Sequence, residues 1–190
     1  MKSLSLFLAT AALALTACGV ATDDPTISMP AATASASVTA SAPSASATAA
    51  ARKDVPAPLR FTATALDGTA FNGASLAGKP VVLWFWAPWC PKCQAEGPAV
   101  AKTAQKYGDR VAFVGVAGLD KSKEAMDRFV SRTGTSGIFQ LDDRTGALYK
   151  HFKVTSQSSY LIVNAEGGTR SAVGPLDEAE LSSLIDEHAL

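Results

Sequence analysis

Residues 78–98 read Gly-Lys-Pro-Val-Val-Leu-Trp-Phe-Trp-Ala-Pro-Trp-Cys-Pro-Lys-Cys-Gln-Ala-Glu-Gly-Pro, and the fold class can be predicted from this stretch. The uninterrupted apolar run at 81–87 is typical of a central strand that is buried on both faces. Residues 92–107 have helical spacing and stop at Gly108, a residue that favours helix C-termini. We therefore predict a buried strand that leads directly into a helix.

The rest of the chain continues this alternation. Apolar and polar residues alternate weakly over 61–66, and this segment ends at the turn dipeptide Asp67-Gly68. The pattern predicts a hairpin that continues near 70–71. Strands that alternate with helices indicate an α/β sheet with helices on both sides. The further strands are expected at 111–116, 160–163 and 169–173, with a turn at 164–168, and the further helices at 122–132, 143–152 and 177–188.

Length and charge restrict the class of protein. The chain has 190 residues, enough for one domain with attachments. Its 17 basic and 17 acidic side chains cancel, and no long run of one sign occurs. Binding to nucleic acid usually requires a basic face that neutralises phosphates. We therefore expect no nucleic-acid partner.

The first residues resemble an export signal. Two residues that include one lysine precede an apolar stretch at 3–15, which is too short to span a bilayer. An ordinary cleavage site after Ala17 would require a small residue at the third position back, where Leu15 stands. Leu15-Thr16-Ala17-Cys18 instead resembles the bacterial lipobox, whose cysteine receives a diacylglyceryl group. We expect residues 1–17 to be a lipoprotein signal peptide and Cys18 to be lipidated, with an ordinary secreted protein as the alternative.

Between this signal and the folded part lies a segment of Ala, Ser, Thr and Pro. Residues 18–55 contain too few large apolar side chains to offset the entropy of ordering, so we expect a disordered tether. A flexible coil of this kind would hold a domain on the order of 30 Å from the bilayer. The expected domain comprises residues 56–190, outside the cytoplasm and anchored to the bacterial cell membrane.

The candidate active site is a pair of cysteines at the start of the predicted helix. Unpaired backbone N–H groups and the helix dipole stabilise negative charge there, and thiols in such positions have pKa values of roughly 3.5–7.5 instead of about 8.5. Cys90 is thus the expected nucleophile, and Lys92 adds a nearby positive charge. Cys93 follows one helical turn later, so we expect a more buried, resolving thiol. Pro91 suits the first turn of a helix.

Two other uses of the pair are disfavoured. A structural disulfide with this spacing would close a very small loop and add little stability. A metal site needs about four ligands, and His151 and His188 are the only further candidates, both in positions that suggest surface residues. We therefore expect a redox pair, with no metal and no cofactor.

The pattern Gly-Lys-Pro, apolar run, Phe-Trp-Ala-x-Trp-Cys-Pro-x-Cys-x-x-Glu-x-Pro resembles the TlpA/ResA/DsbE branch of the thioredoxin superfamily. The resemblance covers about 56–190, and Glu96 and Pro98 match the family's glutamate and helix proline. It implies a thioredoxin fold, with a central mixed β-sheet flanked by helices and an N-terminal β-hairpin extension. It also implies an exported, often membrane-tethered protein that oxidises, reduces or isomerises disulfides, with protein thiol or disulfide clients and a membrane redox partner.

Two positions depart from the superfamily. Thioredoxins proper carry a buried acid where Trp84 stands, so the proton acceptor for Cys93 must lie elsewhere, with Glu96 acting through water or solvent alone as the candidates. Trp84 and Trp86 are expected in the core. Trp89 is expected at an exposed rim, where its amphipathic ring suits the docking of a client peptide.

The second departure is Ser158, which aligns with the superfamily's cis-proline. A cis bond costs about 2.5–4 kcal/mol before serine and roughly 0.5–1 kcal/mol before proline, so the loop either keeps a strained cis bond or relaxes to trans. This departure motivates an alternative function, a thioredoxin-like metal or iron–sulfur binding or chaperone module without turnover. The favoured function is an extracytoplasmic thiol–disulfide oxidoreductase that uses Cys90 and Cys93, with the direction, oxidase or reductase, left open.

Overall fold

The computed structural model describes residues 55–190. The expected signal peptide, Cys18 and nearly all of the expected tether lie outside the described residues. Among the described residues there is no helix with both the length and the apolar character that a bilayer crossing requires.

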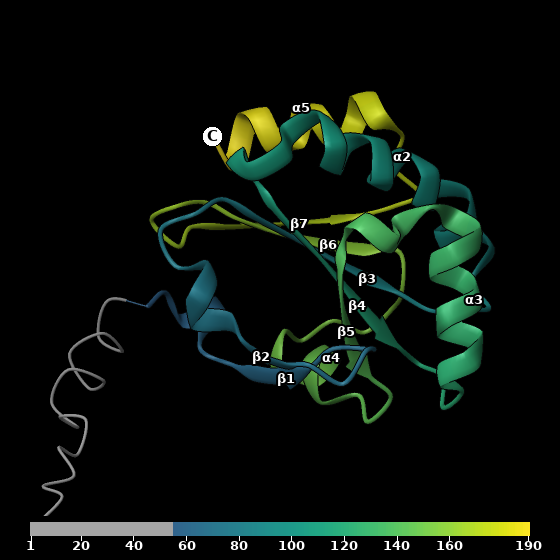
Figure 1. Cartoon of the computed structure of the whole chain (residues 1–190). Coiled ribbons are helices and arrows are strands. Elements are labelled where there is room, and N and C mark those ends of the chain that lie inside the picture. The colour runs from purple at the N-terminus through teal and green to yellow at the C-terminus, as the bar shows by residue number, and fades with distance from the viewer. Residues whose placement is uncertain (1–54) are drawn as a thin grey trace, which may run out of the picture. The chain divides into compact units, whose positions relative to one another are not determined.

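The centre of the domain is a mixed sheet of five strands (Figure 1). The central strand, β3, runs parallel to β4 and antiparallel to β6, and the outer strands β5 and β7 pair with β4 and β6. In their order across the sheet, the strands are β5 (Phe139–Asp143), β4 (Ala112–Gly118), β3 (Val81–Trp86), β6 (Ser159–Val163) and β7 (Thr169–Val173).

Strand β3 is buried along its whole length, as its apolar run predicts. Because successive side chains of a strand point to opposite faces, β3 contributes to two separate cores. Val82, Trp84 and Trp86 belong to one core, and Val81, Leu83 and Phe85 belong to the other.

Helices cover both faces of the sheet (Figure 1). Helices α2 (Pro91–Tyr107), α3 (Lys123–Thr133) and α5 (Glu178–His188) pack on the face of Trp84, whereas the short α4 (Ala147–His151) packs on the face of Phe85. This architecture confirms the expected α/β fold with a mixed sheet flanked by helices.

Helices α2 and α3 approach each other closely at Gly97. A β-carbon added at Gly97 would lie 2.6 Å from the β-carbon of Thr133, which is closer than real side chains pack. Glycine at this position of α2 therefore sets the separation of the two helices.

The expected hairpin is present. Strands β1 (Thr62–Thr64) and β2 (Ala70–Asn72) pair antiparallel, and an isolated bridge joins Ala65 to Leu141 of β5. Short 3₁₀ helices complete the described chain at Ala57–Leu59, Gly73–Leu76, Gly108–Arg110 and Thr135–Gly137.

One strand and one helix differ from the sequence prediction. Strand β5 was not expected, because Phe139–Asp143 mixes apolar residues with an amide and two carboxylates. The helix expected over 143–152 is shorter, because Asp143 is the last residue of β5. Its carboxylate oxygens accept hydrogen bonds from the backbone N–H groups of Leu148 (2.9 Å) and Tyr149 (2.9 Å), at the start of α4.

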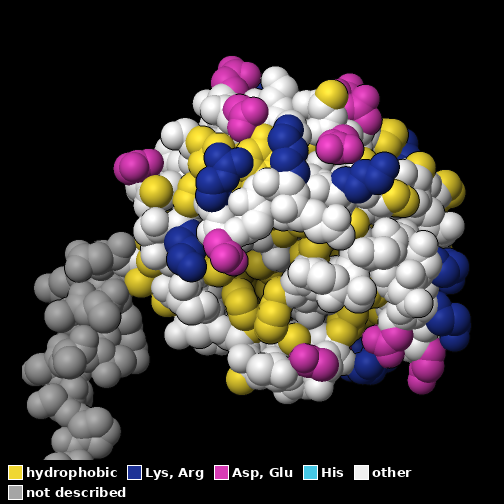
Figure 2. Space-filling model, turned by 45° about the horizontal axis from the view of Figure 1, so that its top comes forward, with side chains coloured by type: hydrophobic (Ala, Val, Ile, Leu, Met, Phe, Trp, Pro, Cys, Tyr) yellow, Lys and Arg dark blue, Asp and Glu magenta, His cyan; other side chains and the backbone are white. Residues whose placement is uncertain are grey.

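Charged side chains are spread over the surface. On the face shown in Figure 2, Lys and Arg are interspersed with Asp and Glu around apolar patches. This pattern agrees with the balanced composition of 17 basic and 17 acidic residues.

Candidate active site

The two cysteines lie where β3 ends and α2 begins. Cys90 is the N-cap residue of α2, and its sulfur accepts a hydrogen bond from the backbone N–H of Cys93 at 3.2 Å. Pro91 occupies the first turn, as expected, and the helix continues through Pro98. Both cysteines are free thiols, so the structure describes the dithiol form of the pair.

Both thiols are shielded from solvent. The exposed fraction is 1% for Cys90 and 0% for Cys93, so the expected contrast between an accessible and a buried thiol is nearly absent. Burial, followed by the hydrogen bond with Cys90, raises the pKa of Cys93 well above that of a free thiol, and the nearby Glu96 acts in the same direction. Cys93 is therefore held as a neutral thiol and needs a proton acceptor before it can act as a nucleophile.

Glu96 lies inside the domain and is only 2% exposed. Its Oε1 accepts a hydrogen bond from the indole N–H of Trp84 at 2.8 Å. Its Oε2 accepts two more, from the Ser158 hydroxyl at 3.0 Å and from the backbone N–H of Leu176 at 3.2 Å. This donor set suits a carboxylate, which only accepts. Glu96 is therefore not the solvent-exposed acid of an ordinary helix start.

Trp84 and Trp86 are in the core, which confirms the expectation for both. Their hydrogen bonds could not be predicted from the sequence. Besides the bond from Trp84 to Glu96, the indole N–H of Trp86 donates to Oε1 of the buried Gln140 at 3.0 Å. A tryptophan thus stands where thioredoxins proper have a buried acid, and it supports a different acid on α2.

Ser158 does not reproduce the geometry of a cis-proline. Within residues 55–190 the one cis peptide bond joins Gly174 to Pro175, so the bond before Ser158 is trans. Ser158 has a φ of 59°, which is uncommon for a residue other than glycine. Its N–H donates to the carbonyl of Phe85 at 2.8 Å, and its carbonyl accepts from Gly174 at 2.7 Å. Both backbone groups of Ser158 are therefore used within the domain.

Trp89 is at the exposed rim, as expected, with 51% of its surface accessible. Its indole N–H donates to the carbonyl of Leu119 at 2.9 Å, which fixes the ring beside another exposed apolar side chain. Lys92 is exposed on the first turn of α2. The entrance to Cys90 is therefore bordered by an apolar ring and a flexible cation.

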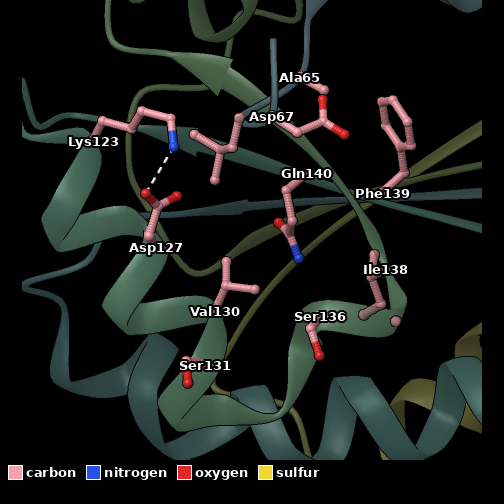
Figure 3. Close-up of a pocket in the computed structure, with 12 residues that line it drawn as sticks. Ala65, Asp67, Lys123, Asp127, Val130, Ser131, Ser136, Ile138, Phe139 and Gln140 are labelled. Atoms are coloured by element: carbon pink, nitrogen blue, oxygen red, sulfur yellow. Dashed lines mark hydrogen bonds and ion pairs between the residues drawn. The ribbon is translucent and has the colours of Figure 1, made fainter. Parts of the chain in front are cut away.

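A shallow hollow of about 680 Å³ lies elsewhere, between α3 and the start of β5 (Figure 3). Val130 and Ile138 contribute apolar surface to it, and Lys123 Nζ forms an ion pair with Asp127 Oδ2 at 2.7 Å. Neither cysteine lines this hollow, so we assign it no part in redox chemistry. Among residues 55–190, no group of three or more His, Cys, Asp or Glu side chains is placed to hold a metal ion.

Comparison with known proteins defines the class. The sequence model of the redoxin family matches residues 28–173, and the chain belongs to this family. The soluble secreted antigen MPT53 of Mycobacterium tuberculosis is 38% identical over 130 residues, which are 67% of this chain and 73% of MPT53.

Solved structures of thiol–disulfide oxidoreductases are similar to this chain in sequence and fold. The structure of MTB DsbF in mixed oxidised and reduced forms is 44% identical, covers 70% of this chain and 98% of DsbF, and has a TM-score of 0.67. A secreted Mycobacterium tuberculosis disulfide oxidoreductase homologous to E. coli DsbE is 38% identical, covers 68% and 97% of the two chains, and has a TM-score of 0.64. These comparisons confirm the TlpA/ResA/DsbE-like family, the thioredoxin fold and the class of enzyme, a thiol:disulfide oxidoreductase.

Proposed function

We propose that Cys90 and Cys93 are the redox pair of a thiol–disulfide oxidoreductase that acts on protein clients outside the cytoplasm. The observation that carries this proposal is the position of Cys90 at the N-cap of α2, with its sulfur 3.2 Å from the backbone nitrogen of Cys93. Backbone N–H groups at a helix start stabilise a thiolate, which is the reactive form of cysteine.

In the reductive direction, the Cys90 thiolate attacks one sulfur of a client disulfide, and the other client sulfur leaves as a thiolate. Cys93 then loses its proton and attacks the Cys90 sulfur of the mixed disulfide. The second client thiolate leaves, and a Cys90–Cys93 disulfide remains. The client gains two electrons and the pair loses two. Oxidation of a client dithiol is the same sequence in reverse, and a membrane redox partner restores the starting state of the pair.

Glu96 is the proposed acceptor of the Cys93 proton. Its charge already acts on Cys93, and solvent has little access because both residues are buried. The donors from Trp84, Ser158 and Leu176 hold the carboxyl group in place before the reaction starts. Glu96 thereby replaces the buried acid that thioredoxins proper carry at the position of Trp84.

Trp89 is the proposed docking residue for clients. Cys90 itself is almost completely covered, so a client must first settle on the surface around it. The exposed ring of Trp89, fixed by its bond to Leu119, offers apolar area at low entropic cost. We expect Trp89→Ala to slow turnover of protein clients and to leave the reaction with a small disulfide unchanged.

The location proposed for the protein is the outer side of the bacterial cell membrane, with Cys18 as the lipid anchor. The lipobox-like sequence supports the anchor, and the relative MPT53 is a soluble secreted protein, which corresponds to the alternative. Labelling of cells with a tagged fatty acid tests the anchor. Label on the wild-type chain that disappears in Cys18→Ser supports it, and an unlabelled wild-type chain in the culture medium contradicts it.

The binding-module alternative has little support from the site. This alternative is motivated by serine at the position of the cis-proline, because serine has a backbone N–H group that proline lacks. That N–H donates to the carbonyl of Phe85 and is not free to receive another ligand. Both cysteines are also too covered to offer an open coordination position.

Site variants of the full chain test the redox assignment. Cys18→Ser serves as the parent, because it removes the third thiol and leaves the pair intact. In this parent, Cys90→Ser should abolish thiol–disulfide exchange, and Cys93→Ser should accumulate a mixed disulfide through Cys90. Undiminished turnover in the Cys90→Ser variant would contradict the assignment. The equilibrium potential of the pair against glutathione then determines the direction.

A further inference from the structure

Tyr160 carries a polar group that the proposed reaction has not yet used. Among the buried side-chain nitrogen and oxygen atoms of residues 55–190, its hydroxyl oxygen is the one without a hydrogen-bond partner. The residue is only 2% exposed. An unsatisfied buried hydroxyl is costly, and a phenylalanine would fill the same space without that cost. The hydroxyl therefore requires an explanation.

Tyr160 lies on the same side of the sheet as the redox site. In the pairing of β3 with β6 it stands opposite Trp84, whose indole N–H holds Glu96. Residues directly opposite each other in an antiparallel pair point to the same face, so the Tyr160 side chain lies on the face of Trp84. Glu96, which accepts from Trp84, is also held by Ser158, the residue before β6. Tyr160, Trp84 and Cys93 belong to one buried core.

The electrostatics agree with this placement. Burial raises the pKa of Tyr160 far above its ordinary value, and the charge of Glu96, a hydrogen-bonding interaction with the Glu96 carboxylate and the charge of Cys93 raise it further. The hydroxyl thus lies close to Glu96 and within the electrostatic reach of Cys93. In the dithiol form its contact with Glu96 does not have the geometry of an ordinary hydrogen bond. The phenol keeps its own proton at any physiological pH.

Glu96 has room for one more donor. A carboxylate oxygen offers two lone pairs. Oε2 already accepts two hydrogen bonds, from Ser158 and Leu176, whereas Oε1 accepts one, from Trp84. One acceptor position on Oε1 therefore remains, and a neutral hydroxyl is a group that can donate there while accepting on its own lone pair.

We propose that Tyr160 relays the proton between Cys93 and Glu96. This inference rests on the proposed redox function of the cysteine pair. As the Sγ–H bond of Cys93 breaks, its proton passes to the hydroxyl oxygen of Tyr160, and the proton that the hydroxyl carried passes to Oε1 of Glu96. Tyr160 is neutral before and after the step. The negative charge moves from Glu96 to the Cys93 sulfur, which then attacks Cys90. In the oxidative direction the same protons return.

The groups that act electrostatically around Cys93 are few. Cys90 and Glu96 lie on or next to α2, Tyr160 on β6 and Tyr149 on α4. Tyr149 is also a buried tyrosine whose pKa is raised, first by burial and then by Cys93. Its hydroxyl, however, donates to the carbonyl of Trp86 at 3.3 Å. Tyr149 is therefore a matched control for Tyr160, with the same side chain but with its hydroxyl already engaged.

The test uses the full chain with Cys18→Ser, reduced and mixed in stopped flow with one equivalent of 5,5′-dithiobis(2-nitrobenzoate). Attack by Cys90 releases one coloured thiolate, and resolution by Cys93 releases the second. We expect Tyr160→Phe to leave the first phase within about twofold and to slow the second at least about tenfold at pH 7. General acid–base catalysis contributes typically about 100- to 10,000-fold, and Glu96 itself remains in this variant. The difference in second-phase rate between Tyr160→Phe and its parent should shrink as pH rises, because hydroxide can then remove the Cys93 proton directly. Tyr149→Phe should leave both phases unchanged.

Three outcomes would overturn the relay. The first is an unchanged second-phase rate in Tyr160→Phe, and the second is an equal slowing of that phase in Tyr149→Phe. The third is a double variant, Tyr160→Phe with Glu96→Gln, in which the second phase slows by the product of the two single-variant factors. Residues that act in one proton path should instead show little additional loss. A merely structural role predicts a lowered melting temperature, whereas the relay predicts an equal or higher one, since no hydrogen bond is removed. Absence of the first phase in the parent would instead refute the redox assignment itself, which keeps the two failures distinct.

Discussion

Replacing Glu96 by Gln should destabilise the domain by about 1–3 kcal/mol, the cost of one unsatisfied buried donor. If the amide oxygen takes the place of Oε2, it keeps the bonds from Ser158 and Leu176. The amide N–H₂ group then faces the indole N–H of Trp84, which lost its acceptor at 2.8 Å. Two donors confront each other in a site that is 2% exposed, so water cannot replace the lost bond.

Urea unfolding of the reduced protein measures this cost, with the free energy of unfolding extrapolated to water. The control is the same substitution in a Trp84→Phe variant, which lacks the indole N–H that the new amide would face but keeps an aromatic ring. In that background, Glu96→Gln should cost much less than in the wild type, because no indole N–H is left unpaired. The reasoning is refuted if Glu96→Gln is as stable as the wild type, or if its cost is the same with Phe at position 84.

Three further predictions concern stability. The folded protein holds the Cys93 proton more tightly than the unfolded chain does, so this contribution to stability should be fully present below about pH 8.5. Above that pH the free energy of unfolding of the reduced form should fall by up to about 1.4 kcal/mol per pH unit. Denaturant titrations at pH 7.5 and 9.5 measure this fall, which should be smaller in Cys93→Ala. Gly97→Ala should lower the free energy of unfolding by about 1–3 kcal/mol in thermal or urea unfolding, because its β-carbon would lie 2.6 Å from that of Thr133. Thr133→Ser or Thr133→Ala should recover part of this loss. Full stability of Gly97→Ala alone would contradict the close approach of the helices. Ser158→Pro should destabilise the domain by at least about 2 kcal/mol, since proline lacks the N–H that bonds to Phe85 and cannot adopt a φ of 59°. Ser158→Gly should cost less. A proline variant of wild-type stability would mean that the loop readily adopts a backbone conformation that proline can take.

Features fixed by neighbouring residues could be predicted from the sequence. The apolar run of β3, the start of α2 at the cysteines and the Asp67-Gly68 hairpin each depend on local periodicity or on a turn dipeptide. The strand β5 could not, because its side chains mix apolar and polar types, and its place is set by pairing with β4.

The polar contacts of the site depend on tertiary folding. Glu96 could be singled out by its motif, but its donors lie 12, 62 and 80 residues away in the sequence. No local pattern shows that Trp84 would donate to it. Tyr160 gave no signal either, since a tyrosine in a buried strand is usually a packing residue. Only the pairing of β6 with β3 in the folded sheet brings Tyr160 near Glu96 and Cys93.

The three donors to Glu96 come from β3, from the residue before β6 and from the segment that follows β7. A chain that stops before residue 176 would therefore contain both cysteines but lack one of the groups that hold the carboxylate. During synthesis, the two thiols emerge from the ribosome long before this last donor does. If Glu96 accepts the Cys93 proton as proposed, fast resolution of a mixed disulfide by Cys93 is expected only after the C-terminal segment has folded against the sheet.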